Sequence, residues 1–202
     1  MKKSSNEALL ISRCINSFLN EYAPSQKTRS EHTVKSYNAA LTLYLGFLET
    51  EKGVDSASFR GESFSVQYIE EWLLWLMNKR GCSPETCNIR LASLRSFLAY
   101  LGQREVSLLY LANGASNIER KKTYRKKVQG MSKVAMKALL ATPDLSTKTG
   151  RRDLALFVLM YGTATRMDEV LSMKVSQLQL RQVEKNNYSI HIIDIKKTRQ
   201  EL

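Results

Sequence analysis

Apolar residues in the first half of the chain recur every three or four positions, which is the spacing of helices that bury one face. The first such stretch predicts a helix over about residues 6–22 that ends before Pro24. A polar stretch follows, and Thr33 is the expected N-cap of a second helix that ends at Gly53. Residues 53–63 lack the pattern and predict a loop.

Two further helices are predicted before residue 102. The third carries Trp72 and Trp75, which are three positions apart on an apolar face. Stacking on nucleic-acid bases is one interpretation of this pair, and packing in the core is the favoured one. The fourth helix has Ser83 as its expected N-cap and Pro84 in its first turn, where both residue types are preferred.

From about residue 128 the pattern predicts a second unit that mixes helices with a strand. Ser132 is expected to cap a short helix through Leu140, and residues 151–161 and 168–173 predict two more helices. Residues 188–195 alternate between two faces and predict a strand. Because a lone strand leaves its backbone hydrogen bonds unpaired, we expect this unit to contain only part of a sheet.

Between these two units the chain carries six basic residues within eight positions and no acidic one. A run of like charges repels itself, so we expect residues 105–127 to be an extended linker between a domain of residues 1–104 and one of residues 128–202. One interpretation is a solvated tether, or a string that resembles a nuclear-localisation signal by chance. The favoured interpretation is a basic strap that lies along a phosphate backbone.

The overall charge indicates what the chain binds. Its 202 residues include 31 Lys and Arg against 19 Asp and Glu, a formal net charge of +12. Such an excess predicts a polyanionic partner, either nucleic acid or an anionic membrane surface. No apolar stretch approaches the roughly 20 residues that span a bilayer, and polar residues stand where a signal peptide needs its apolar core. We therefore expect a soluble, cytoplasmic protein.

Cysteine and histidine usage argues against two further kinds of site. Cys14, Cys82 and Cys87 are odd in number and have no framework spacing, which fits a reducing compartment. His32 and His191 have no cysteine or carboxylate near them at the spacing of zinc ligands. We therefore expect neither a metal nor a cofactor.

The segment from Tyr161 to Met173 is the most informative about chemistry. An apolar helix runs into small residues, and Arg166 then precedes a new helix that carries Glu169. Small residues permit a tight turn close to a phosphate, and a guanidinium can bind two of its oxygens. Glu169 can hold the turn through an ion pair or through a helix cap. An ordinary joint between two helices, with an exposed arginine, explains the spacing equally well.

This segment resembles the first catalytic box of the tyrosine recombinase (phage integrase) family, a Tyr-Gly-Thr-Gly-x-Arg-x-x-Glu pattern before a Leu-rich helix. The matching residues are Gly162, Thr163, Arg166, Glu169 and Leu171, whereas Ala164 replaces a Gly and Met173 a Leu. The resemblance implies that Arg166 is a phosphate-binding arginine and that Glu169 supports it. Residues 192–199 resemble the family's hairpin with a catalytic lysine that acts as general acid. Lys197 is the better match and Lys196 the alternative.

The resemblance extends over nearly the whole chain and implies its fold class, which is mainly α. Residues 1–104 resemble the family's SAM-like four-helix core-binding domain, with Thr33-x-x-x-Tyr37 and Asn88-x-Arg90-Leu91-Ala92-x-Leu94-Arg95-x-Phe97 as the matching motifs. Residues 128–202 resemble the helical start of the family's α+β catalytic domain, which ends here in a β-hairpin region.

Other catalytic elements of the family are not found in the sequence. It contains no His-x-x-Arg, because Lys35 and Asp194 occupy that offset from the two histidines. None of the nine tyrosines stands in the context of the family's nucleophile. Without that nucleophile no 3′-phosphotyrosyl link forms. We therefore expect this chain to be inactive alone and to represent about the first two-thirds of a recombinase.

The leading hypothesis is a DNA-binding, site-specific recombinase or integrase whose complete form cuts and rejoins double-stranded DNA without a cofactor. The resemblance implies other recombinase protomers on that DNA. The expected DNA contacts are polar residues off the apolar stripes of the helices, each otherwise a solvated surface residue, together with the basic run. They are Lys35, Asn38, Arg90, Arg95, Arg120, Lys121, Lys122, Arg125, Lys126 and Lys127.

Two other classes of function stay open. A non-catalytic DNA-binding regulator or accessory factor, derived from a truncated recombinase, would use the same residues. A membrane-surface or protein-interaction module is disfavoured, because the basic residues cluster in the linker and not along one helix face.

Overall fold

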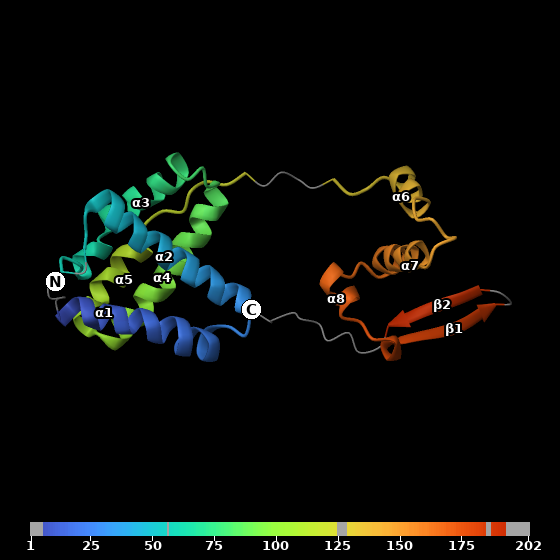
Figure 1. Ribbon diagram of the computed structural model, residues 1–202, viewed down its shortest axis with the longest axis horizontal. Coiled ribbons are helices and arrows are strands. Elements are labelled where there is room, and N and C mark those ends of the chain that lie inside the picture. The colour runs from blue at the N-terminus through green and yellow to red at the C-terminus, as the bar shows by residue number, and fades with distance from the viewer. Residues whose placement is uncertain (1–5, 56, 125–128, 185–186, 193–202) are drawn as a thin grey trace. The chain divides into compact units, whose positions relative to one another are not determined.

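The chain divides into two compact units, residues 1–126 and 127–202. The computed structural model describes residues 6–55, 57–124, 129–184 and 187–192 (Figure 1). The mainly α class is confirmed, and the first unit is entirely helical in its described elements. These elements are α1 (Asn6–Ser17), η1 (Phe18–Lys27), α2 (Glu31–Lys52), η2 (Gly61–Phe64), α3 (Val66–Asn78), α4 (Pro84–Arg104), η3 (Val106–Leu108) and α5 (Leu109–Ser116).

Aromatic rings fill the core of the first unit. Phe18, Tyr44, Trp72 and Phe97 are fully buried, and the ring of Tyr44 meets that of Trp72 edge-on at 5.0 Å between centroids. The core role predicted for Trp72 is thus confirmed. The half-buried Trp75 donates its Nε1–H to a carboxylate oxygen of Glu51 at 3.0 Å. Neither indole stands free to stack on a base.

Several helix ends agree with the sequence prediction. The Ser83 hydroxyl accepts a hydrogen bond from the backbone N–H of Thr86 at 3.3 Å, and Pro84 is the first residue of α4. Gly53 follows α2 with a φ of 64°, in the left-handed region where glycine carries no Cβ penalty. These ends were predictable because each depends on residues close together in the sequence.

The first connection differs from the prediction. The chain does not stop at Pro24 but stays helical to Lys27 in the wider η1 segment, where the N–H of Thr28 bonds the carbonyl of Ala23, five residues back. A wider turn accommodates a proline that cannot join a regular helical ladder. The prediction of Thr33 as an N-cap was also wrong, because α2 begins at Glu31 and Thr33 lies in its first turn.

Residues 105–118, expected within the extended linker, are folded against α4. Leu108, Leu111 and Ile118 are buried in the common core. Gly102 permits this close packing, since a Cβ there would lie 3.0 Å from the Cα of Leu109. The sequence prediction missed this apolar spacing, because it assigned these residues to the same linker as the basic run that follows them.

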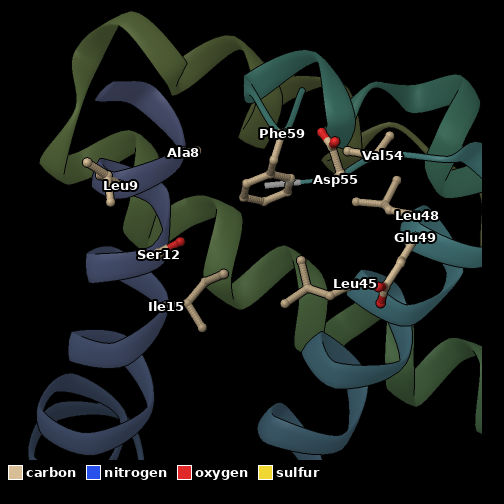
Figure 2. A pocket seen from close by; sticks show the side chains of 10 residues that line it. All are labelled: Ala8, Leu9, Ser12, Ile15, Leu45, Leu48, Glu49, Val54, Asp55 and Phe59. Carbon is tan, nitrogen blue, oxygen red and sulfur yellow. The ribbon is translucent and has the colours of Figure 1, made fainter. Parts of the chain in front are cut away.

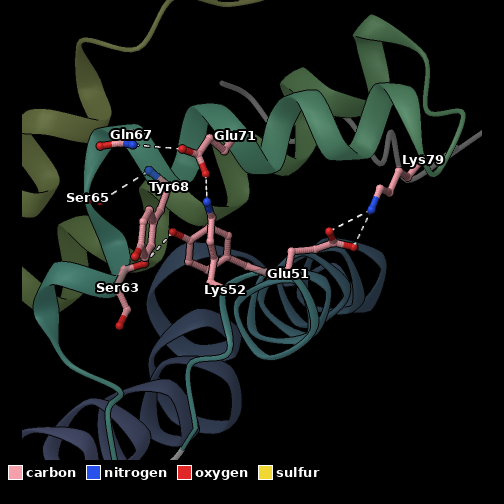
Figure 3. A network of polar contacts seen from close by, with 9 residues as sticks. Glu51, Lys52, Ser63, Ser65, Gln67, Tyr68, Glu71 and Lys79 are labelled. Atoms are coloured by element: carbon pink, nitrogen blue, oxygen red, sulfur yellow. Dashed lines mark hydrogen bonds and ion pairs between the residues drawn. The ribbon is translucent and has the colours of Figure 1, made fainter.

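Polar contacts join the end of α2 to α3 (Figure 3). The ammonium of Lys79 bonds both carboxylate oxygens of Glu51 at 2.9 and 3.1 Å, and Lys52 pairs with Glu71. Hydrogen bonding from Lys79 lowers the pKa of the Glu51 carboxyl. Surface pairs of this kind contribute little free energy, so they align the two helices that the buried rings already hold together.

The second unit contains α6 (Lys133–Leu140), α7 (Lys148–Thr163), α8 (Met167–Leu171), η4 (Val175–Gln177), β1 (Leu178–Glu184) and β2 (Asn187–Ile192). Ser132 caps α6 as predicted, accepting a hydrogen bond from the N–H of Ala135 at 3.1 Å. Helix α7 begins three residues before its predicted start, because the Thr147 hydroxyl accepts from the N–H of Gly150 at 2.9 Å.

The strand expected to stand alone has a partner. Strands β1 and β2 pair antiparallel, with Leu178 opposite Ile192 and Leu180 opposite Ile190. The sequence prediction missed β1 because its polar residues outnumber its apolar ones. Residues 193–195 of the predicted strand lie outside the described residues. In the part of the chain that the structure describes, no helix is long and apolar enough to cross a membrane.

Candidate nucleic-acid interface

Asn88 of α4 binds the start of the basic run through both ends of its side-chain amide. Its Nδ2 donates to the carbonyl of Lys121 at 2.9 Å, and its Oδ1 accepts from the N–H of the same residue at 2.8 Å. One side chain thereby pairs both main-chain polar groups of a residue 33 positions later. The run is therefore attached to α4 at its beginning.

Arg95 lies two helical turns after Asn88 on α4 and holds the segment just before the run. Its Nε donates to the carbonyl of Ala115 at 2.8 Å, and a second guanidinium nitrogen donates to the carbonyl of Ile118. Carbonyls at the end of a helix have no partner within the helix, and Arg95 supplies one. Two of the five N–H donors of Arg95 are therefore engaged within the fold, and its contact with DNA stays a prediction.

Four further basic residues lie on α4 or on the segment attached to it. Arg90 and Lys121 are half-buried, whereas Arg120 and Lys122 are exposed. Burial raises the pKa of the Cys87 thiol, and the neighbouring charges of Arg90 and Lys121 oppose that rise. Burial lowers the pKa of the Arg95 guanidinium, and the charge of Arg120 lowers it further. We call Arg90, Arg95, Arg120, Lys121 and Lys122 the α4 cationic surface.

Among the described residues, the α4 cationic surface has no anionic partner. None of its side chains forms an ion pair with another described residue. The buried Nε of Arg90 also has no hydrogen-bond partner there. Neighbouring like charges repel each other, so the binding of an anion to this surface lowers its free energy.

The remaining predicted contacts fall into two groups. Lys35 and Asn38 are exposed on α2, where Lys35 lies 3.8 Å from the carboxylate of Glu31, and no described contact joins them to the α4 cationic surface. Arg125, Lys126 and Lys127 lie outside the described residues.

In the second unit, Arg166 stands at the start of α8 with an exposed side chain. Its backbone N–H donates to a carboxylate oxygen of Glu169 at 2.9 Å. Its guanidinium forms no ion pair with another described residue. Of the two roles that the sequence left open for Glu169, the structure therefore shows the cap.

The turn before Arg166 has an unusual backbone. Ala164 has a φ of 52° and is the only residue other than glycine with a positive φ among those described. The hydroxyl of Thr163 donates to the carbonyl of Leu159 at 2.6 Å and lies 2.7 Å from that of Thr165. The left-handed conformation accounts for the glycine in the family pattern and makes Ala164 a strained substitute. Lys196 and Lys197 lie outside the described residues.

A hollow in the first unit offers a different kind of surface (Figure 2). It lies between α1, α2 and the loop after α2, and its apolar lining includes Ile15, Leu45 and Phe59. The charged groups that line it are the carboxylates of Glu49 and Asp55, which repel a polyanion. Among the described residues no cluster of three or more metal-ligating side chains occurs.

Asn88 belongs to a motif of the fourth predicted helix, but the sequence indicated no role for it. An amide next to the buried Cys87, on a helix with an apolar stripe, is a weak indication that it bonds within the fold. Its partner could not be found from the sequence, because nothing local points to a residue 33 positions away.

Comparison with known proteins shows which sequences this chain resembles. The model of the phage integrase N-terminal SAM-like domain matches residues 15–105. A protein named as integrase/recombinase y4rC of Sinorhizobium fredii is 28% identical over 81% of this chain and 49% of its own length. Tyrosine recombinase XerD of Pseudomonas putida is 27% identical over 78% of this chain and 49% of its own, and tyrosine recombinase XerC of Bacillus pumilus is 27% identical over 79% and 50%.

This chain spans about half the length of most of the curated relatives it matches. No solved structure matched it significantly. The matched region includes α4, the helix that carries both Asn88 and Arg95. Residues 15–105 thus match the phage integrase N-terminal SAM-like domain, and most of the chain is similar to proteins named as integrases and tyrosine recombinases.

Proposed function

We propose that this chain binds duplex DNA through the first unit and is part of a site-specific recombinase or integrase. The observation that carries the proposal is the α4 cationic surface, whose charges have no acidic partner among the described residues. A phosphate backbone supplies closely spaced negative charges that relieve this repulsion. Binding then releases the counterions that the DNA had condensed, which favours association at low salt.

In this proposal, further residues contact the DNA beside the α4 cationic surface. Lys35 and Asn38 are exposed on α2, which packs against α4. Arg125, Lys126 and Lys127 continue the basic run. Arg95 contributes charge to the surface, and the N–H donors that do not bond Ala115 or Ile118 would bind phosphate.

Strand exchange itself is proposed for a polypeptide of the length of the relatives. There Arg166 would bind a non-bridging phosphate oxygen, and Lys197, or Lys196, would protonate the leaving hydroxyl. Cleavage would form a 3′-phosphotyrosyl bond as the phosphodiester bond breaks, and rejoining would reverse it. The cap by Glu169 would keep the guanidinium of Arg166 available by engaging only its backbone.

Fluorescence anisotropy with a labelled duplex tests the binding proposal. If about six phosphates are neutralised, log K falls with log salt at a slope of about −5. Lys122→Ala should reduce the steepness of that slope by about one, because one phosphate contact is lost. Arg13→Ala removes an equal charge from an exposed position on α1 and should leave the slope unchanged. A slope near zero for the unmutated chain would refute the proposal.

A second candidate is DNA binding without cleavage, through the same α4 cationic surface. For a polypeptide of the length of the relatives, a duplex with a nick beside the cleavage position distinguishes the two, since the released fragment cannot rejoin and a covalent complex accumulates. Shifted protein on a denaturing gel would support strand cleavage. Salt-sensitive binding without any covalent product would support a regulator or accessory factor.

A further inference from the structure

We infer that Asn88 is a positioning residue for DNA binding: it docks the start of the basic run on α4 and so presents Arg120, Lys121 and Lys122 together with Arg90. This inference rests on the proposed function and deepens it. Asn88 itself need not touch DNA, because both ends of its amide are already bonded to Lys121.

The first step of the argument concerns the backbone. A run of basic residues repels itself, and the one aromatic ring within this run, that of Tyr124, is 90% exposed, so the run has little tendency to hold one conformation. Lys121 nevertheless has its N–H and its carbonyl bonded by one side chain of a rigid helix. A neutral amide achieves this without adding a negative charge that would compete with phosphate for the neighbouring cations.

The second step concerns the segment that leads to Lys121. The side chain of Ile118 is buried, and Arg95 bonds the carbonyls of Ala115 and Ile118. Residues 115–121 are thus attached to α4 at Ala115, Ile118 and Lys121. Arg120 lies between Ile118 and Lys121, so its backbone cannot move away from α4 as it would on a free tether.

The third step concerns free energy. Ordering one residue of a flexible chain costs about 1 to 2 kcal/mol, and a segment ordered before binding no longer meets that cost on the DNA. Loss of the dock should therefore weaken binding without removing any contact to phosphate. The affinity falls, whereas the number of phosphates neutralised, and with it the salt slope, stays the same.

The experiment compares the full chain with its Asn88→Ala and Asn88→Asp variants. Asn113→Ala, which replaces an exposed amide on α5, is the matched control. Each protein is titrated against a fluorescein-labelled duplex of mixed sequence between about 50 and 200 mM salt. Each is also digested briefly with trypsin without DNA, and cleavage after Arg120, Lys121 and Lys122 is followed by mass spectrometry.

For Asn88→Ala we expect binding weakened by about three- to tenfold, an unchanged salt slope and clearly faster cleavage in the run. Asn88→Asp keeps the acceptor but loses the donor and adds a negative charge, so it should bind more weakly than Asn88→Ala. Both readings should stay at the unmutated values for Asn113→Ala. Thermal unfolding, followed in parallel, shows that each variant is folded at the assay temperature.

Three outcomes would overturn the inference. Faster cleavage with unchanged DNA affinity would make Asn88 a purely structural residue. Unchanged cleavage would show that the dock does not hold the run. A reduced salt slope in Asn88→Ala would show that the variant loses cationic contacts to phosphate, and not only the order of the run before binding. If the unmutated chain binds no DNA, the proposed function fails, and with it the positioning role for DNA, while the cleavage rates still decide whether the dock exists.

Discussion

The carboxylate of Glu169 accepts a hydrogen bond at 2.9 Å from the backbone N–H of Arg166, the residue that precedes α8. The start of a helix leaves N–H groups without partners, and a carboxylate three residues along can satisfy one of them. The contact engages the backbone of Arg166 and leaves its exposed guanidinium outside any ion pair within the described residues. An arginine held in this way is oriented without being neutralised.

Replacing Glu169 tests that arrangement. Glu169→Ala removes the acceptor and should cost the local structure about 1 kcal/mol, so the N–H of Arg166 should exchange with solvent about fivefold faster. Glu169→Gln keeps a neutral acceptor, so its exchange rate at Arg166 should lie between those of the unmutated chain and Glu169→Ala. Hydrogen exchange resolved to single amides measures both rates. Equal rates in the unmutated chain and Glu169→Ala would show that the cap contributes no stability.

Replacing alanine by glycine should have opposite effects on stability at Ala164 and inside α7. A left-handed backbone costs an L-residue about 1 to 2 kcal/mol, whereas the greater freedom of glycine in the unfolded chain returns about half of that. Ala164→Gly should therefore stabilise the joint between α7 and α8 by about 0.5 to 1 kcal/mol. Ala155→Gly, at an exposed position inside α7, should destabilise it by about 1 kcal/mol. Slower exchange of α7 amides in the first variant and faster exchange in the second would confirm the strain, and the same sign in both would contradict it.

Local features of the fold were predictable because they need only neighbouring residues. The caps at Ser83 and Ser132 and the glycine after α2 each depend on one or two turns of chain. The end predicted at Pro24 failed for a related reason. A proline reports that a regular helix is interrupted, and it does not report that a wider helical turn can continue past it.

The candidate site was predictable in its composition more than in its geometry. The excess of basic residues and the segment around Arg166 indicated phosphate chemistry from the sequence alone. The contacts of Arg95 within the fold were not predictable, because a side chain off the apolar stripe of its helix can point to solvent or to another part of the chain. Only the packed position of α5 places the carbonyls of Ala115 and Ile118 within its reach.

Arg95 should therefore affect stability more than a surface arginine does. Arg95→Met leaves two carbonyls without their charged donor and should destabilise the first unit by about 2 to 3 kcal/mol. Arg95→Lys keeps the charge but not the planar fork, so about half of that loss is expected. Arg13→Lys, exposed on α1, should stay within about 0.5 kcal/mol of the unmutated chain. Urea unfolding followed by tryptophan fluorescence measures all three, and Arg95→Met as stable as Arg13→Lys would contradict the assignment.

Tyr44 should make the stability of the first unit dependent on alkaline pH. Its hydroxyl donates to the carbonyl of Ser63 at 2.7 Å, and burial raises its pKa far above the usual value of about 10. Above that usual value the unfolded chain loses the proton while the folded chain keeps it. The folded state then binds more protons, so its free energy of unfolding falls as the pH rises, by up to about 1.4 kcal/mol per pH unit from this group.

Tyr44→Phe separates this effect from simple loss of a contact. At neutral pH the variant should be less stable by about 1 to 2 kcal/mol, because the buried carbonyl of Ser63 loses its donor. Above about pH 10 the variant lacks the ionisable group, so its stability should fall less steeply and the difference should shrink. Tyr124→Phe, which replaces a ring that is 90% exposed, should not change stability at neutral pH. Urea unfolding between about pH 7 and 11 tests the prediction, and parallel curves for Tyr44→Phe and the unmutated chain would show that Tyr44 ionises as readily folded as unfolded.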